Sequence, residues 1–382
     1  MLKRVHLTLM IGPAVPVPVS QDVLDALTDV EITTPEIGPT VRQMEPTVCR
    51  LSFTLSTHSP LHTIFMLSGG SAIPLVRVVV VATVNGTPEV LMDGVMTNHE
   101  VSPGSDAGHA TLNIMVEDLT RVMDYIDFSG VPFPAMPPEA RVLLILAKYA
   151  MFGVVPMVLP SVLIDIPIPT ERIPRQKGTD LAYVKHLAEE VGYVFYCEPG
   201  PAPGMSIAYW GPQIKVGAPQ PALNIDMGPH SNAQGFSGSF NGESRKLPVL
   251  FIQNPATKVP IPIPIPDITP LNPPLGLIPP IPKSIIPLSG TAKLSPIQAA
   301  LIGLAEAAQS SDAVNAKGSL DVVRYGRVLK ARRLVGVRGV GTAFNGLYYV
   351  KSVTHKIKRG EYKQDFVLSR NGLVSTVPRV PA

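Results

Sequence analysis

Four groups of residues in this 382-residue sequence have types and spacings that catalysis, cofactor binding or metal binding could use. His58 and His62 are four residues apart, which on a helix would place two zinc ligands on one face. Pro60 lies between them in a strand-like stretch and spacing places no third ligand, so we expect no metal site. The segment Gly235-Phe-Ser-Gly-Ser239 resembles a nucleophile elbow, but it ends in serine and lacks the strand-to-helix context. We interpret it as a β-bulge or a turn.

The remaining candidates for chemistry are equally weak. Gly336, Gly339 and Gly341 lack the spacing and the following helix of a dinucleotide-binding loop, so we expect a bulge or a close approach between strands. Glu189 and Glu190 fall on the expected solvent face of a helix, where carboxylates are simply hydrated. We therefore predict that the protein is not an enzyme and uses no cofactor. A cell-wall hydrolase component is kept as an alternative.

The charges are distributed unevenly along the chain. From Asp321 to Ala382, thirteen Lys or Arg face three acidic residues, so this part carries +10 and the rest −7. The basic residues are spread over expected strands and are not interleaved with aromatics as in single-strand binders. We predict a surface that meets a protein partner or lines a channel, with a nucleic-acid-binding module as the alternative. The candidate residues are Arg324, Arg327, Lys330, Arg332, Arg333 and Arg338.

The cysteine content and the hydropathy of the chain indicate the cellular compartment in which it folds. Cys49 and Cys197 are too few for a disulfide framework, which indicates a reducing environment during folding. The first ten residues lack the regions of a signal peptide. The apolar stretch 142–168 is interrupted by a lysine and by prolines, so we expect no membrane span. We predict folding and assembly in the cytoplasm.

The first third of the chain has strand periodicity. A short helix is expected at 22–27, and the dipeptide Asn85-Gly86 is a strong hairpin signal. The valines of Val78–Val81 predict a strand that is covered on both faces. The expected strands are 30–34, 48–55, 76–84, 89–98 and 111–117. Residues 1–130 are therefore expected to form a small antiparallel β-barrel or sandwich.

The middle of the chain, residues 131–218, is predicted as an α+β insert. A helix is expected from Pro138 to Met151, and a second one starts at Thr179 or Asp180 and ends at Gly192. A hairpin of strands 193–197 and 205–210 follows. Residues 219–254 and 312–382 then form a second β-barrel-like domain, with strands expected at 220–227, 233–241, 322–329, 333–337, 346–354 and 362–369. The predicted fold class is α+β, mostly β.

Residues 255–311 interrupt the second β domain. The segment 255–287 holds twelve of the 42 prolines, which excludes a helix or a central strand because proline has no N–H to donate. We predict a stiff polyproline-like strap whose isoleucines dock on a neighbouring domain or subunit, with a plain linker as the alternative. A helix is expected at 295–309. Only 16% of the residues are charged, which favours burial between subunits.

Seven stretches together resemble the late control D family, the baseplate hub proteins of contractile injection systems. The stretches are 16–28, 51–56, 59–61, 179–193, 345–355, 360–366 and 368–372. The resemblance implies a homotrimer in which two barrel domains per chain make a pseudo-sixfold ring. Such a ring adapts a sixfold inner tube to a threefold spike.

The same resemblance implies a set of partners. They are inner tube and baseplate proteins, effector cargo, and a spike that is a separate protein, because the sequence ends at Ala382 without a spike domain. The implied location is a phage-tail-like particle that is assembled in the cytoplasm and then released or attached to the envelope. No nucleic acid is expected as a partner.

Overall fold

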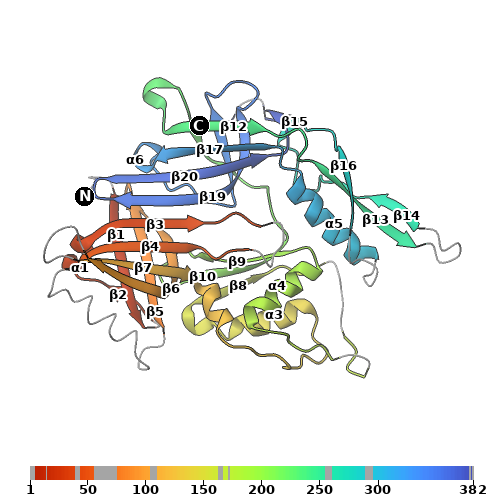
Figure 1. Ribbon diagram of the computed structural model, residues 1–382, viewed down its shortest axis with the longest axis horizontal. Helices are drawn as coiled ribbons and strands as arrows, with labels where there is room; N and C mark the ends of the chain where they lie inside the picture. Colours follow the sequence, from red (N-terminus) through yellow and green to blue (C-terminus); the bar gives the residue numbers. More distant parts are fainter. Residues whose placement is uncertain are drawn as a thin grey trace.

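A computed structural model describes residues 5–13, 15–38, 44–55, 75–103, 110–161, 167–170, 173–253, 260–288, 296–377 and 380. His58 and His62 lie outside these ranges. Most of the described chain forms antiparallel strands with a few helices, which confirms the α+β, mostly β class (Figure 1).

The first β region contains seven strands and one short helix. They are β1 (Val5–Pro13), β2 (Val17–Pro18), α1 (Gln21–Ala26), β3 (Leu27–Thr34), β4 (Val48–Leu55), β5 (Val76–Val84), β6 (Thr87–Pro103) and β7 (Ala110–Asp118). Their order in the sheet is β3-β4-β7-β6-β5-β1-β2. Every expected strand of this region is confirmed, whereas β1 was not anticipated.

The turn between β5 and β6 shows how local sequence sets the register. Asn85 and Gly86 have φ of 49° and 86°, so both adopt the left-handed conformation that a tight hairpin turn needs. Val84 pairs with Thr87 across the turn. The valines Val78–Val81 are all buried, as their uninterrupted apolar run predicts.

The α+β insert packs helices on a three-stranded sheet. Its elements are η2 (Leu119–Asp124), α3 (Pro138–Ala147), η3 (Ala150–Phe152), β8 (Val154–Val158), α4 (Asp180–Glu190), β9 (Val194–Pro199) and β10 (Ser206–Gly211). The sheet order is β8-β10-β9, and the core includes Trp210, Phe195 and Val184. Thr179 caps α4, since its side-chain oxygen accepts from Ala182 N, and Gly192 has φ of 70° beyond the other end. Both predicted helices are confirmed, although α3 ends at Ala147, before the expected end at Met151.

The second β region contains β11 (Gln220–Asn224), η4 (Gly228–His230), β12 (Ala233–Phe240), β17 (Val314–Asp321), α6 (Val322–Tyr325), β18 (Leu334–Arg338), β19 (Gly346–Lys358), β20 (Glu361–Arg370) and β21 (Leu373–Ser375). The predicted strand at 322–329 is wrong. The strand ends at Asp321, whose carboxylate accepts from Val323 N and Arg324 N and so starts a one-turn helix. Gly326, with φ of 81°, ends that helix.

A seam between β3 and β19 joins the two β regions. The strands are antiparallel, with Thr34 opposite Val353 and Asp29 opposite Lys358. The result is one 13-stranded sheet that runs across both regions, and buried residues of both regions share one hydrophobic cluster. The two expected β regions are therefore continuous through this seam.

The proline-rich segment departs from its prediction. Pro260–Pro264 forms an edge strand, β14, antiparallel to β13 (Lys246–Gln253), so the polyproline-like strap is wrong at these residues. β16 (Ser284–Pro287) pairs with the other side of β13, and α5 (Pro296–Ser310) contacts β13. We call β13, β14, β16, the segment that links β14 to β16, and α5 the arm. Figure 1 shows it at one side of the molecule.

Part of the segment that links β14 to β16 docks on the second β region, but Ile268, Ile278 and Ile281 are 48%, 56% and 81% exposed, so the predicted docking of its isoleucines is not seen within the chain. β15 (Gly276–Ile278) pairs with β21, and the Asn371 side-chain oxygen accepts from Leu275 N and Gly276 N at 2.9 and 3.0 Å. Leu275 is buried with Leu334 and Tyr349. Residues 246–253 were expected within the second β domain, but they form β13, which pairs with the arm strands instead.

Candidate interface surfaces

Two of the six candidate basic residues are exposed beside α6. Val322 and Tyr325 are buried on the inner side of this turn, and the Tyr325 hydroxyl donates to Pro221 O at 2.7 Å. Arg324 and Arg327 point away from these anchors and are exposed. The capping by Asp321 thus turns both arginines toward the surface.

The loop after α6 carries three more of the candidates. Leu329 is fixed by Gln364, whose side chain accepts from Leu329 N at 2.9 Å and donates to Leu329 O at 2.8 Å. This places Lys330 Nζ 2.6 Å from Glu89 Oε2 in the first β region. Arg333 follows as an exposed residue.

Arg332 is buried and makes contacts within the chain. Its side chain is 6% exposed, and its guanidinium lies 4.1 Å from the centre of the Tyr196 ring. One guanidinium nitrogen is 3.9 Å from the Glu198 carboxylate. Burial is the main cause that raises the pKa of Tyr196, so this phenol stays protonated under the cation. Arg332 therefore ties the second β region to the insert.

Arg338, at the end of β18, donates to the carbonyl of Val380. The six candidates thus do not form one exposed surface. Arg324, Arg327 and Arg333 are exposed, while Lys330, Arg332 and Arg338 make contacts within the chain. Sequence spacing could not separate these groups, because Glu89 and Glu198 lie in other regions and Val380 lies 42 positions beyond Arg338.

A hollow of about 360 Å³ lies where the loop 328–333 faces β6 and the β9–β10 turn. Its charged lining residues are Glu89, Glu198, Lys330, Arg332 and Arg333. Three cations and two carboxylates thus line the hollow, and Lys330 and Arg332 are already engaged with the two carboxylates. The hollow therefore lies where the first β region, the insert and the second β region meet, and side chains of both charge signs line it.

The glycine-rich candidates have structural roles. Gly235 has φ of 61° at a register shift of β12 against β17, which confirms the bulge. A Cβ on Gly336 would lie 1.8 Å from Val380 Cγ1, and one on Gly339 would lie 1.7 Å from Ile225 O. The predicted close backbone approach is confirmed at Gly339, whereas Gly336 approaches a side chain and a Cβ on Gly341 would meet nothing within 4 Å.

The described part of the chain contains no cluster of three or more metal-ligating side chains. Cys49 and Cys197 are unpaired and buried, as the cysteine count predicted. Burial raises the pKa of both thiols, so they stay protonated and inert at neutral pH. Glu189 and Glu190 are half-buried rather than fully hydrated, since α4 faces α5 on that side.

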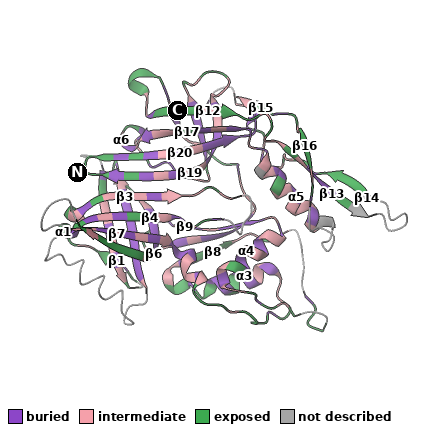
Figure 2. Ribbon diagram, viewed as in Figure 1, coloured by how far each residue is buried: buried purple, intermediate pink, exposed green. Residues whose placement is uncertain are grey.

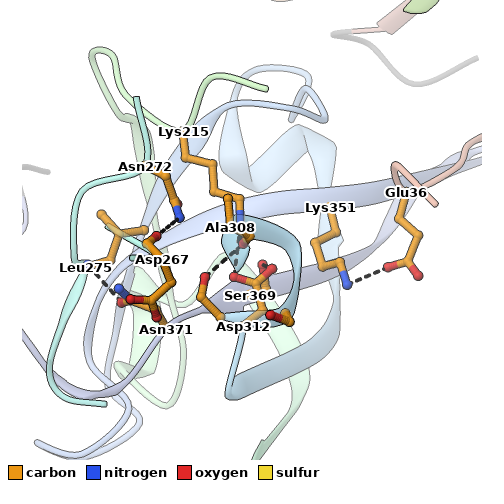
Figure 3. A network of polar contacts seen from close by, with 12 residues as sticks. Glu36, Lys215, Asp267, Asn272, Leu275, Ala308, Asp312, Lys351, Ser369 and Asn371 are labelled. Atoms are coloured by element: carbon orange, nitrogen blue, oxygen red, sulfur yellow. Dashed lines mark hydrogen bonds and ion pairs between the residues drawn. The ribbon is translucent and has the colours of Figure 1, made fainter. Parts of the chain in front are cut away.

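A buried polar network anchors the arm to the second β region (Figure 3). Lys215 Nζ lies 3.0 Å from Asp312 Oδ1 and donates to Ala308 O at 3.4 Å, at the last turn of α5. Asp312 Oδ2 accepts from Ser369 Oγ of β20 at 2.8 Å. The Lys215 side chain is only 4% exposed, so solvent screens this ion pair little. Lys215 and Asp312 are 97 positions apart in the sequence, so this pair could not be predicted from spacing.

No protein-family model and no curated protein matches the sequence. Solved structures do match it. A tail protein from Neisseria meningitidis MC58 and the 43 kDa tail protein of prophage MuSo2 from Shewanella oneidensis each superpose with a TM-score of 0.58 at 12% identity. Each match covers 96% of this chain and 98% of the other. The chain has the fold of phage tail proteins.

A third matching structure is that of a secretion-system component. It is an Escherichia coli protein described as a component of the type VI secretion system with structural similarity to bacteriophage T4 tail proteins. The TM-score is 0.50 at 12% identity, over 93% of this chain and 76% of the other. The resemblance to hub proteins of tail-like systems is therefore confirmed at the level of the fold.

None of the helices within the described ranges has the length and apolarity that crossing a membrane requires. The apolar stretch that begins at Val142 instead supplies α3 and β8 to the insert.

Proposed function

We propose that this chain is a structural baseplate hub of a contractile injection system, which joins a sixfold inner tube to a threefold spike. The observation that carries the proposal is the match to two tail proteins over 96% of this chain and 98% of theirs. A match of that extent leaves little of either chain for an added catalytic domain. The role is assembly, without cofactor chemistry.

The proposed assembly is a homotrimer. Each chain has two β regions that are joined at the β3–β19 seam, so three chains supply six β regions around one axis. Such a ring has threefold symmetry in composition and near-sixfold symmetry in shape, which suits a sixfold tube on one side and a threefold spike on the other. The spike is proposed to be a separate protein, and baseplate proteins and effector cargo are further partners.

The direct test is to locate this chain in a particle. Tail-like particles from the producing cells would be purified and imaged by cryo-electron microscopy, with the chain tagged at its N-terminus. We expect three tags around the axis where the tube meets the spike. Tags along the tube or sheath, or particles without this chain, would refute the hub role.

The exposed arginines provide a mutational test of the same role. Arg324, Arg327 and Arg333 are proposed to line the channel or to meet an acidic partner face. Reversing all three to glutamate should reduce the yield of particles or their cargo by at least tenfold, while the purified chain keeps its melting temperature. Lys317→Glu, an exposed change on β17, serves as the matched control. Particle yield and cargo equal to the control would reject this surface.

A further inference from the structure

The two β regions are built on the same order of strands. In the sheet, the first region runs β3-β4-β7-β6-β5-β1 and the second runs β12-β17-β20-β19, continued by β18 and β11. Strands at the same place in the two orders also come in the same order along the chain. The likeness ends at the last pair, which is antiparallel for β1 and β5 and parallel for β11 and β18. The regions are therefore structural repeats, in which β3 is equivalent to β12, and β6 to β19.

The pairing registers extend this equivalence to single residues. In each region a row of directly paired residues crosses the sheet from the edge strand to the longest strand, and both rows end just before a one-residue bulge. The rows are Ile32, Cys49, Val116 and Met96 in the first region, and Gly238, Ala316, Leu368 and Val350 in the second. Ile32 is thus equivalent to Gly238. Five residues beyond the ends of the rows, Val101 of β6 is equivalent to His355 of β19.

Within one chain, only one of the two equivalent strand pairs is made. At the seam, Ile32 lies directly opposite His355, and both are buried. Among the described residues, no strand pairs with the outer side of β12, or with residues 98–103 of β6 on the side away from β7. We call these two stretches the open edges, and Figure 2 shows exposed residues along both. They lie at opposite ends of eight neighbouring strands, with β12 at the top and β6 at the bottom in Figure 1, so one chain cannot join them.

The backbone groups of both open edges are oriented for pairing. Asn241 N donates to Ala313 O at 2.8 Å, so the odd-numbered residues at this end of β12 face β17 and Gly238 faces outward. Asp118 N donates at 3.0 Å to the carbonyl that precedes β4, and the same alternation across β4 and β7 turns Val101 away from β7. Each open edge therefore presents an N–H and a C=O at the residue equivalent to one of the seam.

Apolar side chains at both open edges point to the core side of the sheet. Val101 lies opposite the buried Leu112 of β7, and Phe240 lies opposite the buried Val314 of β17. Val101 and Phe240 are nevertheless 55% and 41% exposed, because no neighbouring strand covers them within the described chain. If Gly238 lay opposite Val101, Phe240 would be the diagonal neighbour of that valine, within reach of its ring. Joining the open edges would therefore cover both side chains.

We infer that β12 of one copy pairs antiparallel with residues 98–103 of β6 in the next copy, with Gly238 opposite Val101. The contact between copies then repeats the seam within each copy, so the six β regions of the proposed ring meet through equivalent strands. A second copy is the partner because each chain carries one open edge of each kind, and such a head-to-tail contact closes into a ring when its rotation allows. This inference rests on the proposed homotrimer and adds the surface through which its copies meet.

A disulfide between copies tests the register. Ser239 and Glu100 are exposed and lie opposite each other in the inferred pair, at a position without backbone hydrogen bonds, where side chains come closest. The double variant Ser239→Cys with Glu100→Cys, oxidised with diamide, should run on a non-reducing denaturing gel mainly as three linked chains. Ser239→Cys with Val101→Cys is the matched control and should run as single chains, because a shift of one residue puts the thiols on opposite faces. Cys49 and Cys197 are buried and should stay unlinked in both.

The outcomes separate this contact from the proposed function. A double variant that is a trimer by native mass spectrometry but forms no link would overturn the contact and leave the proposed assembly standing. A monomeric wild type would refute the proposed assembly and the contact with it. Linked chains in a ladder beyond three would support the strand pair and refute threefold closure. In purified particles, a link from Ser239→Cys to a protein of another mass would assign β12 to that protein and overturn the inference.

A backbone change keeps the test decisive if the thiols alter the fold. Val101→Pro removes an N–H that faces the open edge and no hydrogen bond to β7, whereas Val101→Thr keeps that N–H. We expect Val101→Pro to raise the concentration at half-assembly by about tenfold or more relative to Val101→Thr, because the contact loses a hydrogen bond. Equal concentrations for the two variants would contradict the pairing.

Discussion

His355 is a buried titratable group at the seam of the two β regions. It lies on β19 opposite Ile32 of β3, and its Nδ1 is 2.8 Å from the Tyr362 hydroxyl. Burial lowers the pKa of His355 from 6.5 to about 4. Above pH 6.5 this histidine is neutral in both the folded and the unfolded chain, so it leaves the stability unchanged there.

The pH dependence of stability should report this histidine. Between pH 6.5 and 4, His355 is protonated in the unfolded chain but not in the folded chain. The free energy of unfolding therefore falls as the pH falls. The loss due to His355 should be about 2 kcal/mol between pH 7 and pH 5. His355→Phe should remove that part of the slope, measured by urea unfolding at both pH values. Equal slopes for the wild type and the variant would show that His355 is not buried as a neutral group.

Residue types were sufficient to predict local backbone features, but not contacts between segments that are distant in the sequence. The cap at Thr179 and the turn at Asn85-Gly86 follow from the preferences of these residues for particular backbone conformations. The burial of Arg332 against Tyr196 depends on two segments that only the fold brings together. In the sequence, Arg332 is one of several closely spaced basic residues, a pattern that is typical of exposed side chains.

The buried pair at the base of the arm belongs to the scale of elements, because it joins α5 to β20. Lys215→Met should destabilise the protein by about 3 to 5 kcal/mol, since it leaves the Asp312 carboxylate without its cation. The double variant Lys215→Met with Asp312→Asn should recover part of this loss, because the unpaired charge is gone. Denaturant unfolding measures both variants. A single variant as stable as the wild type would mean that the pair contributes little.

The prolines of β14 make a second prediction at this scale. Ile265 N donates to Pro248 O at 3.0 Å, and inward and outward residues alternate along β14, so Pro262 and Pro264 face outward. Pro262→Thr with Pro264→Thr would place N–H donors on the outer edge, which then becomes a template for another strand. We expect a several-fold rise in aggregation, followed by light scattering at constant protein concentration. Pro282→Thr, outside the strands of the arm, is the control and should behave as the wild type. Aggregation equal to that of the control would argue against the outward placement.

Most elements could be predicted because their periodicity and their turn residues agree. β4 and β5 match the expected ranges, since Val48–Leu55 alternates and Val76–Val84 is uniformly apolar. The strand β1 was overlooked although its apolar residues also alternate. β14 could not be predicted, because a proline-rich segment forms a strand only when a partner strand such as β13 pairs with its inward-facing residues.

At the scale of the whole molecule, the order of the three regions could be predicted, but not their continuity. Alternation in β3 and β19 indicates two half-buried strands, yet nothing local says that Val30 lies opposite Ile357. The seam depends on which surfaces remain unpaired after each region folds. One 13-stranded sheet therefore holds together two regions that the sequence suggested as separate barrels.

The proposed hub requires that this sheet meets other copies in solution. Native mass spectrometry of the purified chain at micromolar concentration is the most direct measurement. We predict a dominant species of three times the 40.8 kDa of one chain. A single 40.8 kDa species at every concentration up to the solubility limit would contradict the proposed assembly.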